Sequence, residues 1–284
     1  MDLRSRSFVA WVRAWWIAYL MMRLLFRLLM GCGRRNRIMS QLGLHYLNMA
    51  IVSARTIFNI NNIVWEAPHV IGIYDPHVYR LFKKIFGKDG RIFIDAGAYV
   101  GTYTLLAVSL IQKRNDARII SLGPEPGNFK ILKTKTAPYR HLIKALPIAL
   151  WINDDEQVVF HKGGPHSPSG TITVTDMHEK MGYLGGETIN VRTVRLDTLI
   201  HRERLEFVDL VKMDIEGAEL HVLTDPALDL SKVKNLIVEV HYKYWSQESR
   251  RILAALKRLG FKVIPIYPNG KENVYELLAS RVLV

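Results

Sequence analysis

The chain has 284 residues and is 49% apolar, so it is long enough for one large domain with a substantial extension and can build a hydrophobic core. Its single cysteine, Cys32, excludes an intrachain disulfide and a cysteine-based metal site, and it suits a reducing compartment. The net charge of +13 is uneven, because residues 1–90 hold 13 Arg and Lys against 4 Asp and Glu, whereas the remaining residues hold 26 against 22.

Residues 1–37 are predicted to form a basic amphipathic helix. The longest uninterrupted apolar stretch, residues 14–22, is shorter than the roughly 20 residues that a membrane span needs. At about 100° per residue the arginines fall within one arc, while Trp and aliphatic side chains occupy the rest of the surface. We therefore expect residues 6–34 to make peripheral contact with a membrane, with the arginines toward anionic headgroups. The alternatives are packing on the protein's own core or on a second subunit, and a processed signal. The arginines are Arg6, Arg13, Arg23, Arg27 and Arg34.

Two further regions follow. Residues 38–90 are predicted to form a helical or cap region, in which the pattern over 78–86 fits a short helix. Residues 91–284 are predicted to form the main domain, an α/β fold with a mostly parallel sheet and helices on both faces, because strand and helix patterns alternate along it. Strands are expected near 91–95, 118–122, 142–149, 207–213, 234–241 and 261–266, and helices near 100–112, 126–136, 216–224 and 246–259.

The stretch from about 155 to 195 interrupts this alternation. It is rich in Gly and Pro and contains β-branched runs at 171–175 and 188–194. We expect an inserted hairpin or loop excursion here. Since ligands of open α/β sheets bind at the carboxyl ends of the strands, the insertion is suited to cover or shape a substrate site.

The stretch 92–104 is the most informative in the chain. A short apolar run ends in Asp95, Gly97 and Gly101 follow, and a helical pattern then begins. Glycines let the backbone approach a ligand closely and a helix start offers free N–H groups, which together suit a nucleotide-like ligand. The G-x-G-x-x-G spacing of dinucleotide sites is missing, and a carboxylate inside the motif favours a ligand that carries positive charge. S-adenosylmethionine, with its ammonium and sulfonium groups, fits that description.

Four stretches together resemble the FkbM family of S-adenosylmethionine-dependent methyltransferases. They are residues 95–104, 124–129, 208–219 and 238–241, and the third is the most specific. The resemblance covers roughly residues 74–266. It implies that residues 91–284 form an S-adenosylmethionine-binding domain of the Rossmann-like class I fold, with a mostly parallel seven-stranded sheet. It also implies transfer of a methyl group, usually to a hydroxyl oxygen.

The resemblance further indicates which residues hold the cofactor. Asp95, at the end of the first strand, is expected near the ammonium group, and the glycine turn is expected to let the backbone approach. The alternatives are a helix N-cap for Asp95 and ordinary turn positions for the glycines. The expected cofactor-binding residues are Asp95, Gly97, Ala98, Tyr99, Gly101, Thr102, Glu125, Asn128, Ala149 and Asp214.

One position departs from the family pattern. The family usually places a ribose-binding Glu directly before the Pro-x-Pro-x-Asn-Phe stretch, and this chain has Gly123 there. Glu125 is the only nearby carboxylate in the sequence. Either Glu125 takes over through a shifted loop, or ribose binding is weakened, or water fills the gap. Asn128 either caps the following helix or touches the ribose.

Polar residues at the ends of two later strands are the catalytic candidates. Asp214 and Glu216 follow a buried strand, where a carboxylate can act as general base toward a substrate hydroxyl or orient it, and Lys212 can pair with one of them. Glu239 and His241 lie two residues apart on the next strand, so they face the same side. An imidazole beside a carboxylate accepts protons near neutral pH, which makes His241 the leading candidate for the base. Structural ion pairing and helix capping are the alternative roles.

The predicted function is an S-adenosylmethionine-dependent O-methyltransferase acting on a hydroxyl of a glycan, lipid-linked or small-molecule acceptor. No metal site is predicted, and the expected location is the cytoplasm, at the inner face of the cell membrane where the N-terminal helix would bind. The charge suggests a nucleic-acid (RNA) methyltransferase as a rival, although the excess lies outside the core and no Asn/Asp-Pro-Pro-Tyr motif follows the fourth strand. Gly123 suggests a second rival, a non-catalytic cofactor-binding or scaffold protein of the same fold.

Overall fold

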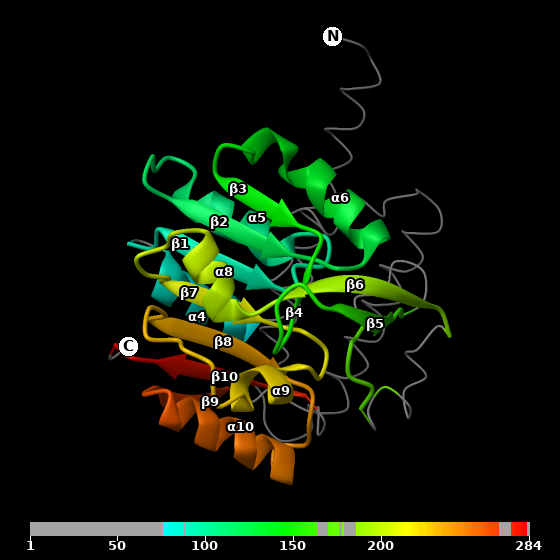
Figure 1. Ribbon diagram of the computed structural model, residues 1–284. Helices are drawn as coiled ribbons and strands as arrows, with labels where there is room; N and C mark the ends of the chain where they lie inside the picture. Colours follow the sequence, from blue (N-terminus) through cyan, green and yellow to red (C-terminus); the bar gives the residue numbers. More distant parts are fainter. Residues whose placement is uncertain are drawn as a thin grey trace, which may run out of the picture. The chain divides into compact units, whose positions relative to one another are not determined.

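The computed structural model describes residues 76–87, 89–163, 170–175, 178, 186–266 and 274–282 (Figure 1). The predictions for residues 1–75, including the basic amphipathic helix, lie outside this part of the chain. No helix among the described residues is long and apolar enough to cross a membrane.

The elements in chain order are α4 (Pro76–Phe86), β1 (Ile92–Ala96), α5 (Thr102–Ile111), β2 (Arg118–Leu122), α6 (Pro126–Thr136), the 3-10 helix η2 (Ala137–Tyr139), β3 (Ile143–Leu146), β4 (Ala149–Leu150), β5 (Gln157–His161), β6 (Thr188–Val194), α8 (Leu196–Arg202), β7 (Leu210–Met213), α9 (Glu219–Thr224), β8 (Asn235–Val240), α10 (Gln247–Arg258), β9 (Lys262–Ile266) and β10 (Tyr275–Ser280).

Seven of these strands form one sheet in the order β3-β2-β1-β7-β8-β10-β9. β1 lies at its centre and pairs in parallel with β2 and β7, which places Asp95 beside Ser121 and Lys212. β10 runs antiparallel to both β8 and β9. The predicted α/β fold with a mostly parallel seven-stranded sheet is therefore confirmed, although strand β10 and helix α8 were not among the predicted elements.

Helices cover both faces of the sheet, as predicted. Successive residues of a strand point to opposite faces, so Phe93 and Ile94 of β1 enter different cores. Phe93 packs with α4 and α5, and its ring centroid lies 5.0 Å from that of Phe82. Ile94 belongs to the core beneath α8, α9 and α10. Because both faces are buried, the central strands are mostly apolar, with Asp95 on β1 and Lys212 on β7 as buried exceptions, and this pattern made them recognisable in the sequence.

The predicted strand over 142–149 is in fact two strands. β3 ends at Leu146 and β4 begins at Ala149, with Pro147 in the break. Proline has no N–H to donate to a ladder, so a strand rarely continues through it. β4 instead leaves the main sheet and pairs with β6 in a small sheet of order β4-β6-β5.

The insertion near 155–195 contains the expected hairpin, formed by β5 and β6, which are antiparallel. The β-branched run at 171–175 is not part of it. Thr171 forms an isolated bridge with His161, and its hydroxyl accepts a hydrogen bond from the Thr173 N–H at 2.9 Å. Short threonine side chains often compete with strand pairing in this way. Figure 1 shows this hairpin beside the ends toward which the arrows of β1, β2 and β3 point.

Candidate active site

A cavity of about 250 Å³ lies at the carboxyl ends of β1, β2 and β7. This is the edge at which open α/β sheets bind their ligands. The loops after these strands supply one part of its wall, including Gly97, Tyr99, Gly123, Glu125, Asp214 and Glu216. The insertion and the small sheet supply another, including Ala149, Phe160, Lys162, Gly170 and Ile172. The expectation that the insertion shapes a site at this edge agrees with these contacts.

The loop after β1 follows a path that few residues other than glycine can adopt. Gly97 has φ of 86°, and a Cβ atom built on it would lie 1.7 Å from the Asp214 carbonyl oxygen. Tyr99 has φ of 49°, a left-handed conformation that is uncommon outside glycine. Gly97 therefore allows the loop after β1 to pass directly beside the loop after β7, so that both border one cavity.

Not all of the predicted cofactor-binding residues border the cavity. Asp95 is only 1% exposed and is outside the lining set, and its carboxylate accepts a hydrogen bond from the Thr104 hydroxyl at 2.6 Å. Burial raises the pKa of Asp95 to about 6, against the opposing effects of Thr104 and Lys212. Ala98, Gly101 and Thr102 are also absent from the lining set. Gly97, Tyr99, Glu125, Asn128, Ala149 and Asp214 are all part of it.

Glu125 and Gly123, the two positions in question for ribose binding, both lie at the end of β2 and line the cavity. Glu125 lines the cavity and also caps α6, since its Oε2 accepts a hydrogen bond from the Asn128 N–H at 2.6 Å. Its Oε1 lies 3.6 Å from Nζ of Lys162 on the insertion. The residue that caps α6 is therefore Glu125, and not Asn128 as one of the alternatives had it. A Cβ atom at Gly123 would meet its nearest neighbours at 3.7–3.9 Å, which is ordinary contact, so the position has room for a side chain.

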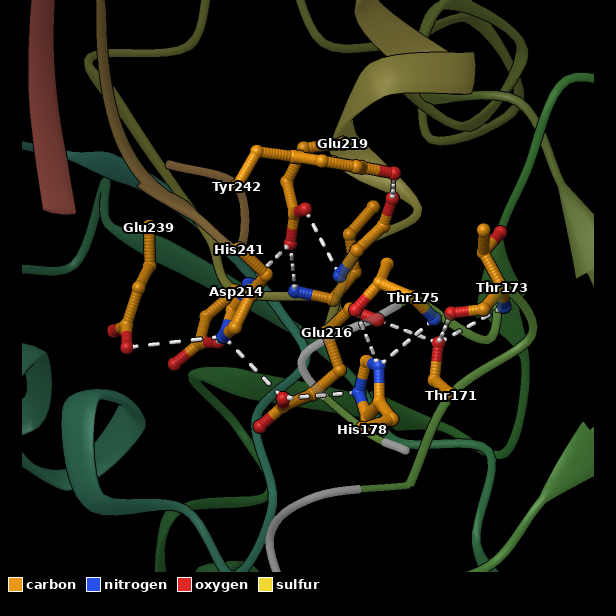
Figure 2. Close-up of polar contacts among 12 residues, drawn as sticks. Thr171, Thr173, Thr175, His178, Asp214, Glu216, Glu219, Glu239, His241 and Tyr242 are labelled. Carbon is orange, nitrogen blue, oxygen red and sulfur yellow. Dashed lines mark hydrogen bonds and ion pairs between the residues drawn. The ribbon is translucent and has the colours of Figure 1, made fainter. Parts of the chain in front are cut away.

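A cluster of charged side chains borders the cavity where β7 and β8 end (Figure 2). We call it the acidic cluster; it comprises Lys212, Asp214, Glu216, Glu219, Glu239 and His241. His241 Nε2 lies 3.3 Å from Glu216 Oε2 and 3.8 Å from Asp214 Oδ1. Lys212 Nζ lies 3.6 Å from Asp214 Oδ2 and 3.4 Å from Glu239 Oε2. The structure thus brings all four predicted catalytic residues together, and of these Asp214 and Glu216 line the cavity.

Glu219 is a buried member of the acidic cluster and holds His241 and the turn after β7 in place. Its side chain is fully buried, and its Oε1 lies 3.1 Å from His241 Nδ1 and accepts the Ile215 N–H at 3.0 Å. Its Oε2 accepts the Gly217 N–H at 2.9 Å. The expected helix over 216–224 begins only at Glu219, because Glu216 and Gly217 have positive φ angles, which an α-helix cannot contain.

The turn between β7 and α9 is strained. Glu216 has φ of 53°, a left-handed conformation that costs free energy for a residue with a side chain, and Gly217 has φ of 96°. The Thr171 hydroxyl donates to the Glu216 carbonyl at 2.5 Å, and Tyr242 donates to the Gly217 carbonyl at 2.8 Å. These contacts fix a backbone path that turns the Glu216 carboxylate toward His241.

The charges of the acidic cluster shift each other's ionisation. Burial and the neighbouring Glu239 raise the pKa of Asp214 to about 8, against the attraction of Lys212 and His241. Burial lowers the pKa of His241, but Glu219 and Glu216 outweigh it and hold that pKa well above its usual value. His241 is 3% exposed and both of its ring nitrogens face carboxylates. These contacts suit an imidazole that binds a cation or carries a proton more than one that takes a proton from a substrate.

Sequence reasoning did not find His178, although it lies beside the acidic cluster. It is fully buried, and its Nε2 lies 3.6 Å from Glu216 Oε2 (Figure 2). Its Nδ1 lies 2.8 Å from the Thr175 hydroxyl. No local signal marks this histidine, because the residue it faces is far away along the chain. Glu219 lies in the resembling stretch 208–219, but that stretch does not indicate its contact with His241, which follows another strand, β8.

The sheet order, the cavity and the acidic cluster together define a Rossmann-like methyltransferase domain. The comparison with known families agrees and is more specific. The chain belongs to the FkbM methyltransferase family, because the family model described as "Methyltransferase FkbM domain" matches residues 95–263, more than half of the chain.

Known relatives are distant. The chain is 25% identical over 228 residues to the AMB antimetabolite synthetase AmbE of Pseudomonas aeruginosa, covering 66% of this chain but only 10% of that protein. It is 23% identical over 194 residues to the hexuronic acid methyltransferase AglP of Haloferax volcanii, covering 68% of this chain and 73% of that protein. A solved structure of methyltransferase FkbM from Methylobacillus flagellatus KT shares 15% identity at a TM-score of 0.45, covering 68% of this chain and 44% of the other.

Proposed function

We propose that this chain is an S-adenosylmethionine-dependent methyltransferase that methylates a hydroxyl oxygen of a sugar-containing acceptor. The observation that carries the proposal is the placement of Asp214 and Glu216, which both line the cavity and belong to the acidic cluster. One set of carboxylates therefore faces the space for a cationic cofactor and the place where an acceptor would enter.

The residues of the cavity fit the cofactor. Leu122, Ile148 and Leu150 give it an apolar side suited to an adenine ring, and the glycine at 97 adds no side chain to its wall. Glu216 offers negative charge to the ammonium and sulfonium groups, and Asp214 does so when it is ionised, since burial raises its pKa to about 8. Asp95 supports the site from behind, through Thr104, and does not border the cavity. S-adenosylmethionine supplies an electrophilic methyl group when it is bound.

The chain's own residues then position the acceptor and receive its proton. The hydroxyl is held against Asp214 and Glu216, and its proton passes to one of these carboxylates as the oxygen becomes a nucleophile. Holding the two reactants side by side in a closed cavity accounts for much of the rate. The many carboxylates here favour a neutral hydroxyl over a carboxylate as the reacting oxygen, because like charges repel.

The sugar-containing acceptor is supported by the similarity to the hexuronic acid methyltransferase AglP. Membrane contact through residues 6–34, and with it a lipid-linked acceptor, stays a prediction from the sequence. The proposal is tested by incubating the full chain with methyl-labelled S-adenosylmethionine and uronic-acid-containing glycans. We expect label in an alkali-stable methyl ether. Label in an alkali-labile methyl ester would contradict the choice of a hydroxyl, and no transfer to any glycan would contradict the acceptor class.

Replacing Gly123 with Glu is expected to tighten cofactor binding. The position lines the cavity and has room for a Cβ atom, so a carboxylate there would reach the space where the family holds the ribose. A hydrogen bond to a charged group is worth about 1.5–3 kcal/mol, so the dissociation constant for S-adenosylmethionine should fall about tenfold or more. Calorimetric titration measures it. Gly123→Ala, which adds the Cβ atom alone, is the matched control, and equal affinities of both variants would contradict the placement of the ribose.

A further inference from the structure

The acidic cluster concentrates negative charge in a buried place. Glu219 is fully buried, Glu216 and Glu239 are 15% and 23% exposed, and Asp214 is 30% exposed. Lys212 contacts two of these four carboxylates, Asp214 and Glu239. Crowded carboxylates of this kind are costly unless a positive charge lies among them.

Three atoms of the acidic cluster converge on one point. One ligand atom from each of Asp214, Glu216 and His241 lies within 4.8 Å of the other two. His241 Nε2 lies 3.8 Å from Asp214 Oδ1 and 3.3 Å from Glu216 Oε2. Two metal–ligand bonds of about 2.0–2.2 Å separate their ligand atoms by about 3 to 4.4 Å, a range that contains both of these distances. We propose that these three side chains bind a divalent cation at the edge of the cavity, with carboxylate oxygens and an imidazole nitrogen as its ligands.

The other side of His241 is arranged as in known metal sites. A metal-binding histidine almost always donates its second ring N–H to a carboxylate or carbonyl, which fixes the tautomer and the ring's orientation. Glu219 Oε1 lies 3.1 Å from His241 Nδ1, and Glu219 is itself fixed by the N–H groups of Ile215 and Gly217. With the proton on Nδ1, Nε2 presents its lone pair toward Asp214 and Glu216.

His178 is a second and independent observation that points to a ligand. It is fully buried, and among the described residues its Nε2 has no hydrogen-bond partner. That nitrogen faces Glu216 Oε2 at 3.6 Å, on the side of Glu216 away from His241 (Figure 2). Its Nδ1 lies 2.8 Å from the Thr175 hydroxyl, which can accept a proton from it and leave Nε2 free to bind a cation. His178 thus places one further nitrogen 3.6 Å from one of the three proposed ligands, Glu216.

A cation at this position gives the acidic cluster a function within the proposed reaction. It would hold the acceptor hydroxyl beside the cavity and favour its ionised form, as bound cations do for coordinated oxygens. This role rests on the proposed function, whereas binding of the cation does not. Ligands of mixed oxygen and imidazole type suit Mn²⁺ and Zn²⁺.

The test uses the full chain, stripped with a chelator and then titrated with Mn²⁺, with free Mn²⁺ followed by electron paramagnetic resonance. We expect one saturable site. His241→Gln and Asp214→Asn should each weaken binding by at least about 10–100-fold, and Glu219→Gln by about 10–100-fold because a neutral amide raises the basicity of His241 less than a carboxylate does. His221→Gln, a histidine of α9 outside the acidic cluster, is the matched control and should bind as the parent chain does. Zn²⁺ should displace the Mn²⁺.

Two outcomes would overturn the inference. One is no saturable binding of Mn²⁺ or Zn²⁺ by the parent chain, a result that does not depend on any variant folding. The other is equal Mn²⁺ binding by the parent chain and by a folded His241→Gln variant. S-adenosylmethionine binding, measured by calorimetry on the same stripped protein, separates this failure from failure of the proposed function. If the protein binds the cofactor but no cation, the proposed metal site is refuted and the proposed function is not.

Discussion

Replacing Asp214 with Asn is expected to lower methyl transfer by about 10²–10⁴-fold, the range found when a positioned acid–base group is lost. Asp214, like Glu216, belongs to both the cavity and the acidic cluster, since it lines the first and lies 3.8 Å from His241 Nε2 in the second. An amide of the same shape neither takes the acceptor's proton nor offers a negative charge to a cation. The loss should appear mainly in kcat/KM for the acceptor, measured with labelled cofactor.

Folding should be nearly unaffected by this change, because the Asp214 side chain is 30% exposed and its ion pair with Lys212 is long, at 3.6 Å. Asp116→Asn is the matched control, since it makes the same chemical change at a site 52% exposed, where surface ion pairs contribute little. It should retain the parent activity. Activity of Asp214→Asn within a few-fold of the parent would rule out a direct role for Asp214.

Replacing Glu219 with Ala is expected to lower the free energy of unfolding by about 3–5 kcal/mol, the usual cost of removing one partner of a buried ion pair. The change removes the carboxylate that faces His241. It also leaves the N–H groups of Ile215 and Gly217 without their acceptor. The melting temperature should fall by about 2–4 °C for each kcal/mol lost. Urea unfolding followed by circular dichroism measures the effect.

Glu219→Gln gives the graded comparison. The amide keeps one acceptor oxygen, so it can serve Ile215 and His241 but turns an NH₂ group toward the Gly217 N–H. We expect a smaller loss, about 1–3 kcal/mol for one unsatisfied buried donor. Glu206→Ala, at an exposed position, should change stability little. Unfolding free energies within about 1 kcal/mol for Glu219→Ala and the parent chain would show that Glu219 does not hold the turn.

The parts of the fold that were predicted from the sequence are those with a strong local pattern. β1, β2, α6 and α10 fall close to their predicted bounds, because buried parallel strands are apolar runs and a cap such as Ser246 marks a helix start. The strand β10 depends on antiparallel pairing with β8, whose residues lie far away along the chain. The break between β3 and β4 lies at Pro147, a residue that disfavours the continuous strand predicted over 142–149.

The sequence pointed to Asp214, Glu216 and His241 as candidates, but not to their arrangement, and it did not point to His178. The positions of Asp214, Glu216 and His241 at strand ends follow from the sheet, so their meeting could be expected. Which of these three side chains borders the cavity could not be expected from the sequence. It depends on the left-handed turn at Glu216 and on the buried carboxylate of Glu219. The contact of His178 with Glu216 joins the insertion to the end of β7, and no periodicity predicts such a pairing.

Isothermal titration of the full chain with S-adenosylmethionine tests the central claim most directly, with S-adenosylhomocysteine as competitor. The cavity at the ends of β1, β2 and β7 predicts saturable one-to-one binding within the range of about 1 μM to 1 mM that is typical of enzyme substrates, and displacement by the competitor. No saturable binding of either compound at millimolar concentration would contradict the assignment of this chain as an S-adenosylmethionine-dependent enzyme.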